Sequence, residues 1–418
     1  MAARPWFLQE AAAGPGPEPL GFAAFKAAYE ALHAAGARRA SGARWLVFWN
    51  GDGLGNWMLG ATSAMLLAAL TGRLFAVLDP KADVCAWMAS PLCAWTASLP
   101  GELRDAARRR GKRAPAEDVL AKVDLVGVYF QGCSFRKLKC TERFRGDVSD
   151  KQVVLVQSGT WFGDVLLLNE AYGPRLRAAF SRPLPSAAPG ARDGAPPDVI
   201  DLYGPLARWL FAPAPGLAVA VDAYAAEWLR AEGQTSICVQ GRWGTGQEFK
   251  KAARCVDRLL AAPWWPRGQT VLHVASMRKE FRERARKKYG TRAHWPPWDD
   301  GTWRQQDDAT AYKDMLLVGR CHIVVLPTGG STFSYMSTAM HHSVAVRDAG
   351  DKRNGGLPGL LRLAVVAVRE AVPPAAAAAR QKVFREGSCL GSPVRSAGRP
   401  KSAALGVTHF EKQMKEKK

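Results

Sequence analysis

The 418-residue sequence lacks most of the short motifs that assign a function by themselves. It has no CxxC pair and no Cys/His spacing typical of structural zinc. It has no Asn-x-Ser/Thr sequon, so N-glycosylation gives no argument for secretion. No secretory signal is visible, and no apolar run is long enough for a transmembrane segment; the nearest, residues 57–70, fits a buried helix better. Helix-turn-helix, zinc-finger and RNP-like motifs are absent as well, so no specific nucleic-acid partner is expected.

Acidic residues are few. There are 37 Asp and Glu against 58 Lys and Arg, which gives a net charge of +21. Such an excess predicts an anionic partner, and nucleic acid, anionic lipid and nucleotide phosphates all satisfy it. The basic runs 108–113, 278–288 and 412–418 are equally compatible with solvated surfaces. Because 48% of residues are hydrophobic and 23% charged, the composition is that of a folded protein, and its length suggests two or three domains.

The eight cysteines leave the redox state open. Cys133 and Cys140, and likewise Cys85 and Cys93, are close enough in sequence to form a disulfide in an oxidising compartment. Buried free thiols explain them equally well.

A first α/β unit begins after a leader, residues 1–40, that is loose or loosely helical, with one helix expected over 22–35. Apolar runs at 45–49 and 74–78 predict buried strands, and the stretch between them predicts a glycine turn and a helix over 56–70. This βαβ order indicates a parallel sheet. Further strands are expected at 123–129 and 153–157, helices at 206–211 and 220–230, and a linker at 183–197.

A second α/β unit begins near residue 235. It predicts strands at 236–240, 270–276 and 323–327, and helices at 248–260, at 279–289 and from 333 onward. Two such units suggest two facing domains with a cleft between them. We expect an acceptor-side domain over 41–232 and a nucleotide-sugar domain over 233–350. A packing helix and a low-complexity basic tail would follow over 351–418.

Three segments at strand ends have the composition of ligand-binding turns. Gly53, Gly55 and Asn56 form an incomplete dinucleotide motif that is not a P-loop, and a tight turn without ligand is the alternative. Arg242 follows a strand and can hold a diphosphate by paired hydrogen bonds, although a lone Arg is more often a surface charge. Ser331 and Thr332 open a helix, where they form either an anion site or simple N-caps.

Together these segments resemble the plant-type xyloglucan fucosyltransferase family, which is related to other fucosyltransferases. Residues 53–59 resemble its "GLGNR" run, and 91–100 its "EPFPxxxWLLP" segment. Residues 208–213 resemble "RYLFxP", 239–242 "IQIR", 271–289 "VLVTSL…LKEMY" and 331–335 "STFGY". The matches keep the family's order over about residues 50 to 340. Trp57 and Gly241 depart from the pattern, and the family's Cys-rich C-terminal end and N-terminal membrane anchor have no counterpart.

The resemblance implies a GT-B fold and a Golgi enzyme of cell-wall polysaccharide synthesis. Its donor would be GDP-fucose, used without an obligatory metal or other cofactor, and a glycan hydroxyl would be fucosylated with inversion. Arg242 would stabilise the leaving diphosphate. The remaining donor-binding residues would be Ser276, Ser331, Thr332, Phe333 and Tyr335, while Gly53, Gly55 and Asn56 would face the cleft.

Several functional alternatives stay open at this point. The catalytic base is unassigned among Asp52, Asp79 and Asp300. The donor could also be a nucleotide sugar other than GDP-fucose. A non-catalytic homologue that binds nucleic acid or glycan would also fit the charge.

Overall fold

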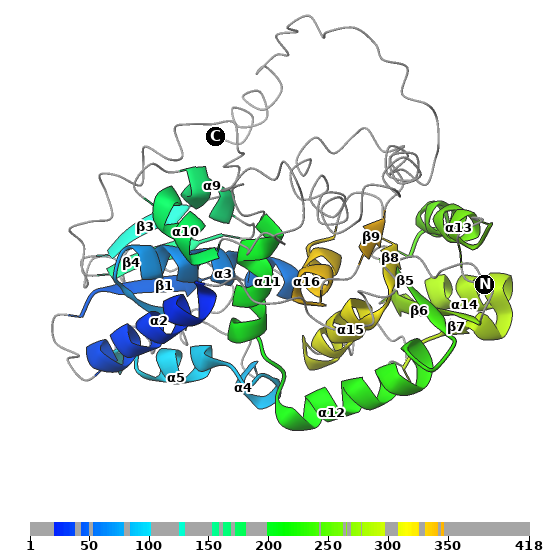
Figure 1. Ribbon diagram of the computed structural model, residues 1–418, viewed down its shortest axis with the longest axis horizontal. Helices are drawn as coiled ribbons and strands as arrows, with labels where there is room; N and C mark the ends of the chain where they lie inside the picture. The colour runs from blue at the N-terminus through cyan, green and yellow to red at the C-terminus, as the bar shows by residue number, and fades with distance from the viewer. Residues whose placement is uncertain are drawn as a thin grey trace, which may run out of the picture.

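The computed structural model describes residues 21–37, 43–49, 53–78, 84–101, 125–129, 153–158, 162–168, 172–180, 199–241, 244–261, 265, 269–276, 278–296, 308–325, 331–341 and 344–346. Two parallel β-sheets lie in the two halves of the molecule, with helices packed around and between them (Figure 1). The expected linker at 183–197 and the expected C-terminal tail lie outside the described residues.

The first sheet has the strand order β2-β1-β4-β3 and is parallel throughout. Its strands are β1 (Trp45–Trp49), β2 (Leu74–Leu78), β3 (Leu125–Tyr129) and β4 (Val153–Gln157). Helix α3 (Leu54–Leu70) connects β1 to β2, which confirms the predicted βαβ unit. At Gly60 an added Cβ would overlap the Ser158 carbonyl and the Phe48 ring, so this glycine lets α3 lie close to the sheet.

Helix α2 (Phe22–Ala37) is part of the first domain. Phe22 and Tyr29 are buried in the main core, and the Tyr29 hydroxyl donates a hydrogen bond to the Arg73 carbonyl at 3.1 Å. The helix expected over 22–35 is confirmed, and its aromatic residues are buried against the first domain. The other described helices that precede the second sheet in sequence are α4 (Val84–Trp87), α5 (Pro91–Ala97), α9 (Gly163–Leu168), α10 (Gly173–Phe180), α11 (Val199–Leu210) and α12 (Pro215–Tyr224). Helix α12 continues as a π-helical turn (Ala225–Leu229) and packs against the second half (Figure 1).

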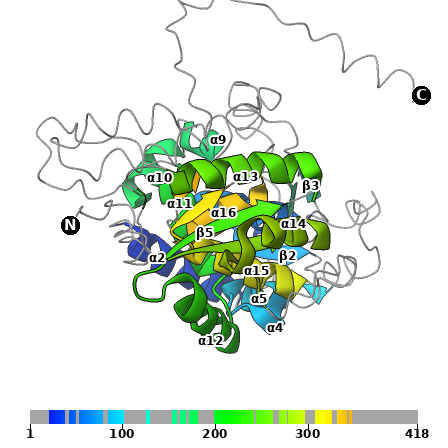
Figure 2. The ribbon, with the colours of Figure 1, turned by 90° about the vertical axis from the view of Figure 1, so that its right-hand side faces the viewer.

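The second sheet has the order β7-β6-β5-β8-β9, again fully parallel. Its strands are β5 (Thr235–Gly241), β6 (Thr270–Ser276), β7 (Ala293–His294), β8 (Ile323–Val325) and β9 (Val344–Val346). Helices α13 (Gly246–Ala261) and α14 (Lys279–Tyr289) cover its outer face, and a 3-10 turn (Gly290–Arg292) follows α14 (Figure 2). The predicted strands and helices of this unit are confirmed.

The two halves share one apolar core. Helices α15 (Asp308–Arg320) and α16 (Thr332–His341) belong to the second unit by sequence, yet α16 packs on α3 and α11 of the first. Cys238 and Ala275, on the inner face of the second sheet, belong to the same core cluster as Leu46 and Phe48 of β1. The expected α/β architecture with two Rossmann-like domains is confirmed, whereas the cleft between them stays a prediction.

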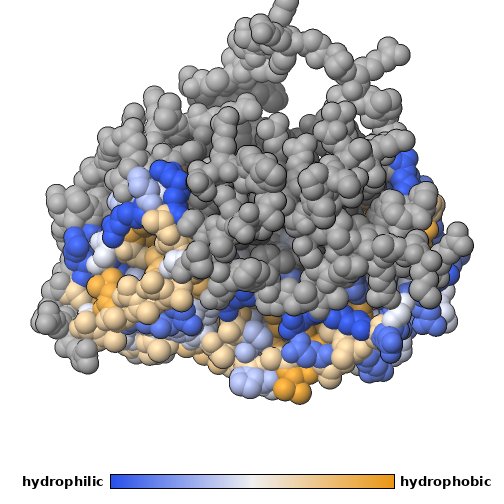
Figure 3. All heavy atoms as spheres, viewed as in Figure 1, coloured by the Kyte–Doolittle hydropathy of each residue, from blue (hydrophilic) through white to orange (hydrophobic). Residues whose placement is uncertain are grey.

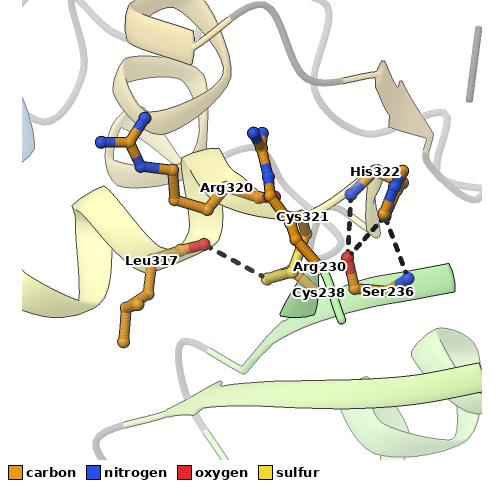
Figure 4. Close-up of a disulfide and its surroundings, with 7 residues drawn as sticks. All are labelled: Arg230, Ser236, Cys238, Leu317, Arg320, Cys321 and His322. Carbon is orange, nitrogen blue, oxygen red and sulfur yellow. Dashed lines mark hydrogen bonds between the residues drawn. A yellow bond between two sulfur atoms is a disulfide. The ribbon is translucent and has the colours of Figure 1, made fainter. Parts of the chain in front are cut away.

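A buried disulfide joins Cys238 on β5 to Cys321 in the turn between α15 and β8 (Figure 4). Beside it, the backbone N–H of Ser236 donates to His322 Nδ1, and the His322 N–H donates to Ser236 Oγ, both at 3.1 Å. A second disulfide joins Cys85 to Cys93, one of the two pairs suggested by sequence. None of the described cysteines is a free thiol. The pair Cys133 and Cys140 lies outside the described residues.

The exposed surface carries few large apolar side chains where the structure describes it. Leu32 and Val219 are the exposed large hydrophobic residues there. Polar and apolar residues are mixed along the lower edge of the face in Figure 3. None of the helices among the described residues combines the length and the apolar character needed to cross a bilayer.

Candidate functional site

The second sheet has a topological switch point at β5. The chain continues from β5 to β6 and β7 on one side and returns to β8 and β9 on the other. In open parallel sheets, ligands bind outside the carboxyl ends of the strands at such a point. Gly241 is the last residue of β5, and Arg242, outside the described residues, follows it directly. The run 331–335 opens the helix after β8. Two of the sequence-predicted segments therefore flank this switch point.

Ser276 lies at the carboxyl end of β6, beside Gly241 in the strand register. It is buried, and its Oγ donates to the Gly241 carbonyl at 2.9 Å while accepting from the Arg278 N–H at 3.2 Å. The guanidinium of buried Arg282 donates to the Ser276 carbonyl. The Ser276 hydroxyl thus donates its hydrogen bond to the backbone of β5. This bond holds the Gly241 carbonyl, directly before Arg242 in sequence.

The residues 331–335 form the N-terminal turn of α16. Ser331 precedes the helix and is buried, and Phe333 is half-buried against the main core. The Ser334 hydroxyl donates to the Gln240 side-chain carbonyl, which joins this turn to the end of β5. Of Thr332 and Tyr335 the structure describes the backbone within the helix. The N–H groups of a helix N-terminus favour an anion, so this turn suits a phosphate.

The turn between β5 and α13 packs closely against α14, and glycines make this possible. A Cβ on Gly241 would lie 2.6 Å from the Phe281 ring, and one on Gly244 would lie 2.5 Å from the Arg278 side chain. Gly244 also has φ +67°, a conformation that strains other residues. Phe281 therefore occupies the space of the apolar side chain that precedes the Arg in the family pattern, which explains the departure at Gly241.

In the first sheet the switch point lies between β1 and β4, and α3 starts there. Gly53 precedes α3 and is exposed, Gly55 is buried and Asn56 is half-buried. A Cβ on Gly53 would meet nothing within 4 Å, so packing does not require glycine at this position. Trp57 is buried with its ring 5.6 Å from that of Phe211, so this departure from the family pattern is a core residue.

The positions of the described residues do not identify a catalytic base or a metal site. Asp52, Asp79 and Asp300 all lie outside the described residues. Among the residues that the structure describes, no group of three or more His, Cys, Asp or Glu could hold a metal ion.

Two buried titratable groups lie in the second half, away from the ends of the strands. His273, in the middle of β6, is fully buried, and neither ring nitrogen has a hydrogen-bond partner among the described residues. Burial, and then the charge of Arg282, lower the pKa of His273 to about 3. Asp314 on α15 is also buried, and burial raises the pKa of its carboxyl to about 7 although Arg282 and Lys313 oppose the change. These groups should make the stability of the domain depend on pH in opposite directions, over pH ranges that overlap.

Comparison with known proteins supports the family suggested by sequence. A model of the family "Xyloglucan fucosyltransferase" matches residues 16–117. The chain resembles that family. The match covers the helix α2, the Gly53–Asn56 segment at the start of α3, and α5, whereas the segments around Arg242 and Ser331 lie beyond it. A search of curated protein sequences found no match.

A solved structure extends the likeness in fold over most of the chain. A variant of Arabidopsis thaliana FUT1 in complex with GDP is 16% identical, with a TM-score of 0.58, and the match covers 81% of this chain and 82% of that one. The fucosyltransferase NodZ from Bradyrhizobium is 14% identical with a TM-score of 0.43 over 74% of this chain and 96% of that one. The GT-B fold predicted from the fucosyltransferase resemblance is thereby confirmed.

Sequence reasoning missed the contacts that join the end of β5 to α16 at the candidate site. Gln240 was part of the "IQIR" match but had no assigned role, and Ser334 stands where the family pattern has glycine. They are 94 positions apart, so their hydrogen bond requires the fold to bring β5 and α16 together. The signals that pointed to this region were Arg242 after a strand and the helix start at Ser331, together with the "IQIR" and "STFGY" matches.

Proposed function

We propose that this chain is an inverting glycosyltransferase that transfers L-fucose from GDP-fucose to a glycan hydroxyl, without an obligatory metal. The observation that carries the proposal is the pair of segments at the β5 switch point. Gly241, directly before Arg242, ends β5, and Ser331 precedes α16, whose first turn is hydrogen-bonded to β5 through Ser334 and Gln240. The end of β5 is at the switch point where parallel sheets bind nucleotides. The fucosyltransferase resemblance over residues 16–117 and the shared fold support the choice of donor.

The chemistry follows from charge. The acceptor oxygen forms a bond to the anomeric carbon of fucose while the bond from that carbon to the diphosphate breaks, so negative charge develops on GDP. Arg242 would bind the β-phosphate and stabilise that charge. The turn 331–335 would hold the phosphates and nearby nucleotide through its N–H and hydroxyl groups, with Ser331, Thr332, Phe333 and Tyr335 as its members.

A glycan acceptor would approach from the first domain, past Gly53, Gly55 and Asn56. The proton of its hydroxyl would pass to a base or to water, and no described residue is assigned to this step. We place the enzyme in the Golgi lumen. The disulfides Cys85–Cys93 and Cys238–Cys321 support an oxidising compartment.

The first test is calorimetric titration of the full chain with GDP, GDP-fucose, UDP and UDP-galactose. We expect binding of the two guanine nucleotides, and Arg242→Ala should weaken GDP binding about tenfold to a hundredfold, as expected for a lost charge-assisted hydrogen bond. Arg258→Ala is the matched control, because Arg258 is an exposed arginine on α13 of the same domain. Its GDP affinity should equal that of the wild type.

Three outcomes would contradict the proposal in different ways. Preference for UDP-sugars would keep the fold and replace the donor. Absence of nucleotide binding, together with capture of RNA that weakens steeply between 50 and 200 mM salt, would favour a nucleic-acid-binding protein. Equal losses in Arg242→Ala and Arg258→Ala would show that Arg242 has no specific role.

A further inference from the structure

The last residues of β5 are held from both sides by serine hydroxyls. On one side is Ser276, at the end of the neighbouring strand β6, and on the other is Ser334, in the first turn of α16. Both are buried, with Ser334 fully enclosed and Ser276 only 3% exposed. Each hydroxyl donates to a different group of the Gln240–Gly241 pair, so the end of β5 is fixed both at a side chain and at the backbone.

The Ser276 contact acts on the peptide bond that leads into Arg242. Its Oγ donates to the carbonyl oxygen of Gly241, and that carbonyl belongs to the peptide group whose nitrogen is Arg242 N. Ser276 is itself fixed, because its Oγ accepts from the Arg278 N–H and its carbonyl accepts from the Arg282 guanidinium. The Phe281 ring fills the space beside Gly241. The Gly241 end of β5 is therefore held by β6 and α14 together.

The Ser334 contact joins this strand end to the helix that would bind phosphate. Gln240 is buried in β5 with only 8% of its surface exposed, and its side-chain carbonyl accepts from the Ser334 hydroxyl. Ser334 is the third residue of α16, two residues after the helix starts. Any shift of the α16 N-terminus against β5 would break this buried hydrogen bond, which leaves a polar group without a partner.

We infer that Ser276 and Ser334 are positioning residues, which hold the end of β5, directly before Arg242 in sequence, at a fixed place relative to the N-terminus of α16. A nucleoside diphosphate would contact both elements at once, so its affinity depends on their relative position. Neither serine needs to touch the nucleotide for this role. For Ser276, we propose this positioning role in place of the direct contact with the nucleotide sugar that was expected from sequence. The inference rests on the proposed function, since it assigns Arg242 to the terminal phosphate of GDP.

The test compares the affinities of GMP and GDP, which differ in that terminal phosphate. Calorimetry on the full-length wild type should show GDP binding at least about tenfold tighter than GMP. In Ser276→Ala and in Ser334→Ala, GDP affinity should fall about threefold to tenfold, as for one lost hydrogen bond, with GMP affinity unchanged within twofold. Arg242→Ala should show the largest effect among the variants, because it should abolish the preference for GDP over GMP.

Ser337→Ala is the control variant. Ser337 is also fully buried on α16, but its hydroxyl donates to the Phe333 carbonyl within the same helix at 2.9 Å rather than to a group of β5. It should retain the wild-type ratio of GDP to GMP affinity even if its melting temperature falls. Melting curves for all variants confirm that each is folded at the titration temperature, and the two serine variants test the inference independently if one of them does not fold.

The results separate this inference from the proposed function. If the wild type binds no guanine nucleotide, or binds GDP and GMP equally, the assignment of Arg242 to the terminal phosphate is wrong and the inference fails with it. If the wild type prefers GDP and neither serine variant reduces that preference, the donor site stands and the positioning role is wrong. Equal loss of GMP and GDP affinity, or an equal effect of Ser337→Ala, would also overturn it by showing general damage to the domain.

Discussion

At the scale of single residues, His273 and Asp314 should give the second domain opposing pH responses. The pKa of His273 falls from 6.5 to about 3 through burial, so between these values the unfolded chain binds a proton that the native chain does not, and stability falls as pH falls. The pKa of Asp314 rises from 3.8 to about 7 through burial, so between those values the native chain holds the extra proton, and stability falls as pH rises.

Because the two windows overlap between about pH 4 and pH 6.5, the two effects should largely cancel in the wild type. Asp314→Asn should leave the His273 effect, so that its unfolding free energy, relative to wild type, rises with pH by up to about 1.4 kcal/mol per unit. His273→Asn should show the opposite slope. Urea unfolding of the three proteins at several pH values in this window measures both slopes, and parallel curves would contradict the assignment.

At the scale of elements, helix α13 begins with a reciprocal cap. Thr245 Oγ1 accepts from the Glu248 N–H at 3.1 Å, and the buried Glu248 carboxylate accepts from the Gly244 N–H at 2.9 Å. Thr245→Ala should lower the unfolding free energy by about 1 kcal/mol, since an N–H at the helix start loses its acceptor. Gln247→Ala, at an exposed position in the same turn, is the control and should change stability by less than about 0.5 kcal/mol. Chemical denaturation measures both.

The elements themselves could be predicted from sequence where local pattern decides them. The apolar runs 45–49 and 74–78 became β1 and β2 at those bounds, and residues 279–289 became α14, because burial and period are local properties. Helix α2 was expected over 22–35, but its burial in the core could not be predicted, since its aromatic residues show their role only where the folded domain packs on them. Contacts between distant positions, such as Gln240 with Ser334, could not be predicted from one sequence. The residues at strand ends were identifiable by type, while the roles of Arg242 and its neighbours stay predictions.

At the scale of the whole molecule, the second domain is closed by a long-range covalent link. Cys238 and Cys321 are separated by 83 positions, whereas Cys85 and Cys93 are separated by 8. In the chain-entropy view a disulfide stabilises by restricting the unfolded chain, so the longer loop should contribute about 4.5 kcal/mol and the shorter about 2.5 kcal/mol. The Cys238–Cys321 link also joins β5, which leads to Arg242, to the start of β8, which leads to α16.

The two links therefore offer a matched comparison. The double variant Cys238→Ala with Cys321→Ala should lose more unfolding free energy than Cys85→Ala with Cys93→Ala, by about 2 kcal/mol. It should also lose GDP affinity, because the strand end and the α16 turn that would bind the diphosphate are no longer tied through β5 and β8. Chemical denaturation and GDP titration under non-reducing conditions measure both effects. If the two double variants are equally stable, the loop-length argument is wrong, and if GDP affinity is unchanged in a folded Cys238 variant, packing alone holds the two segments in place.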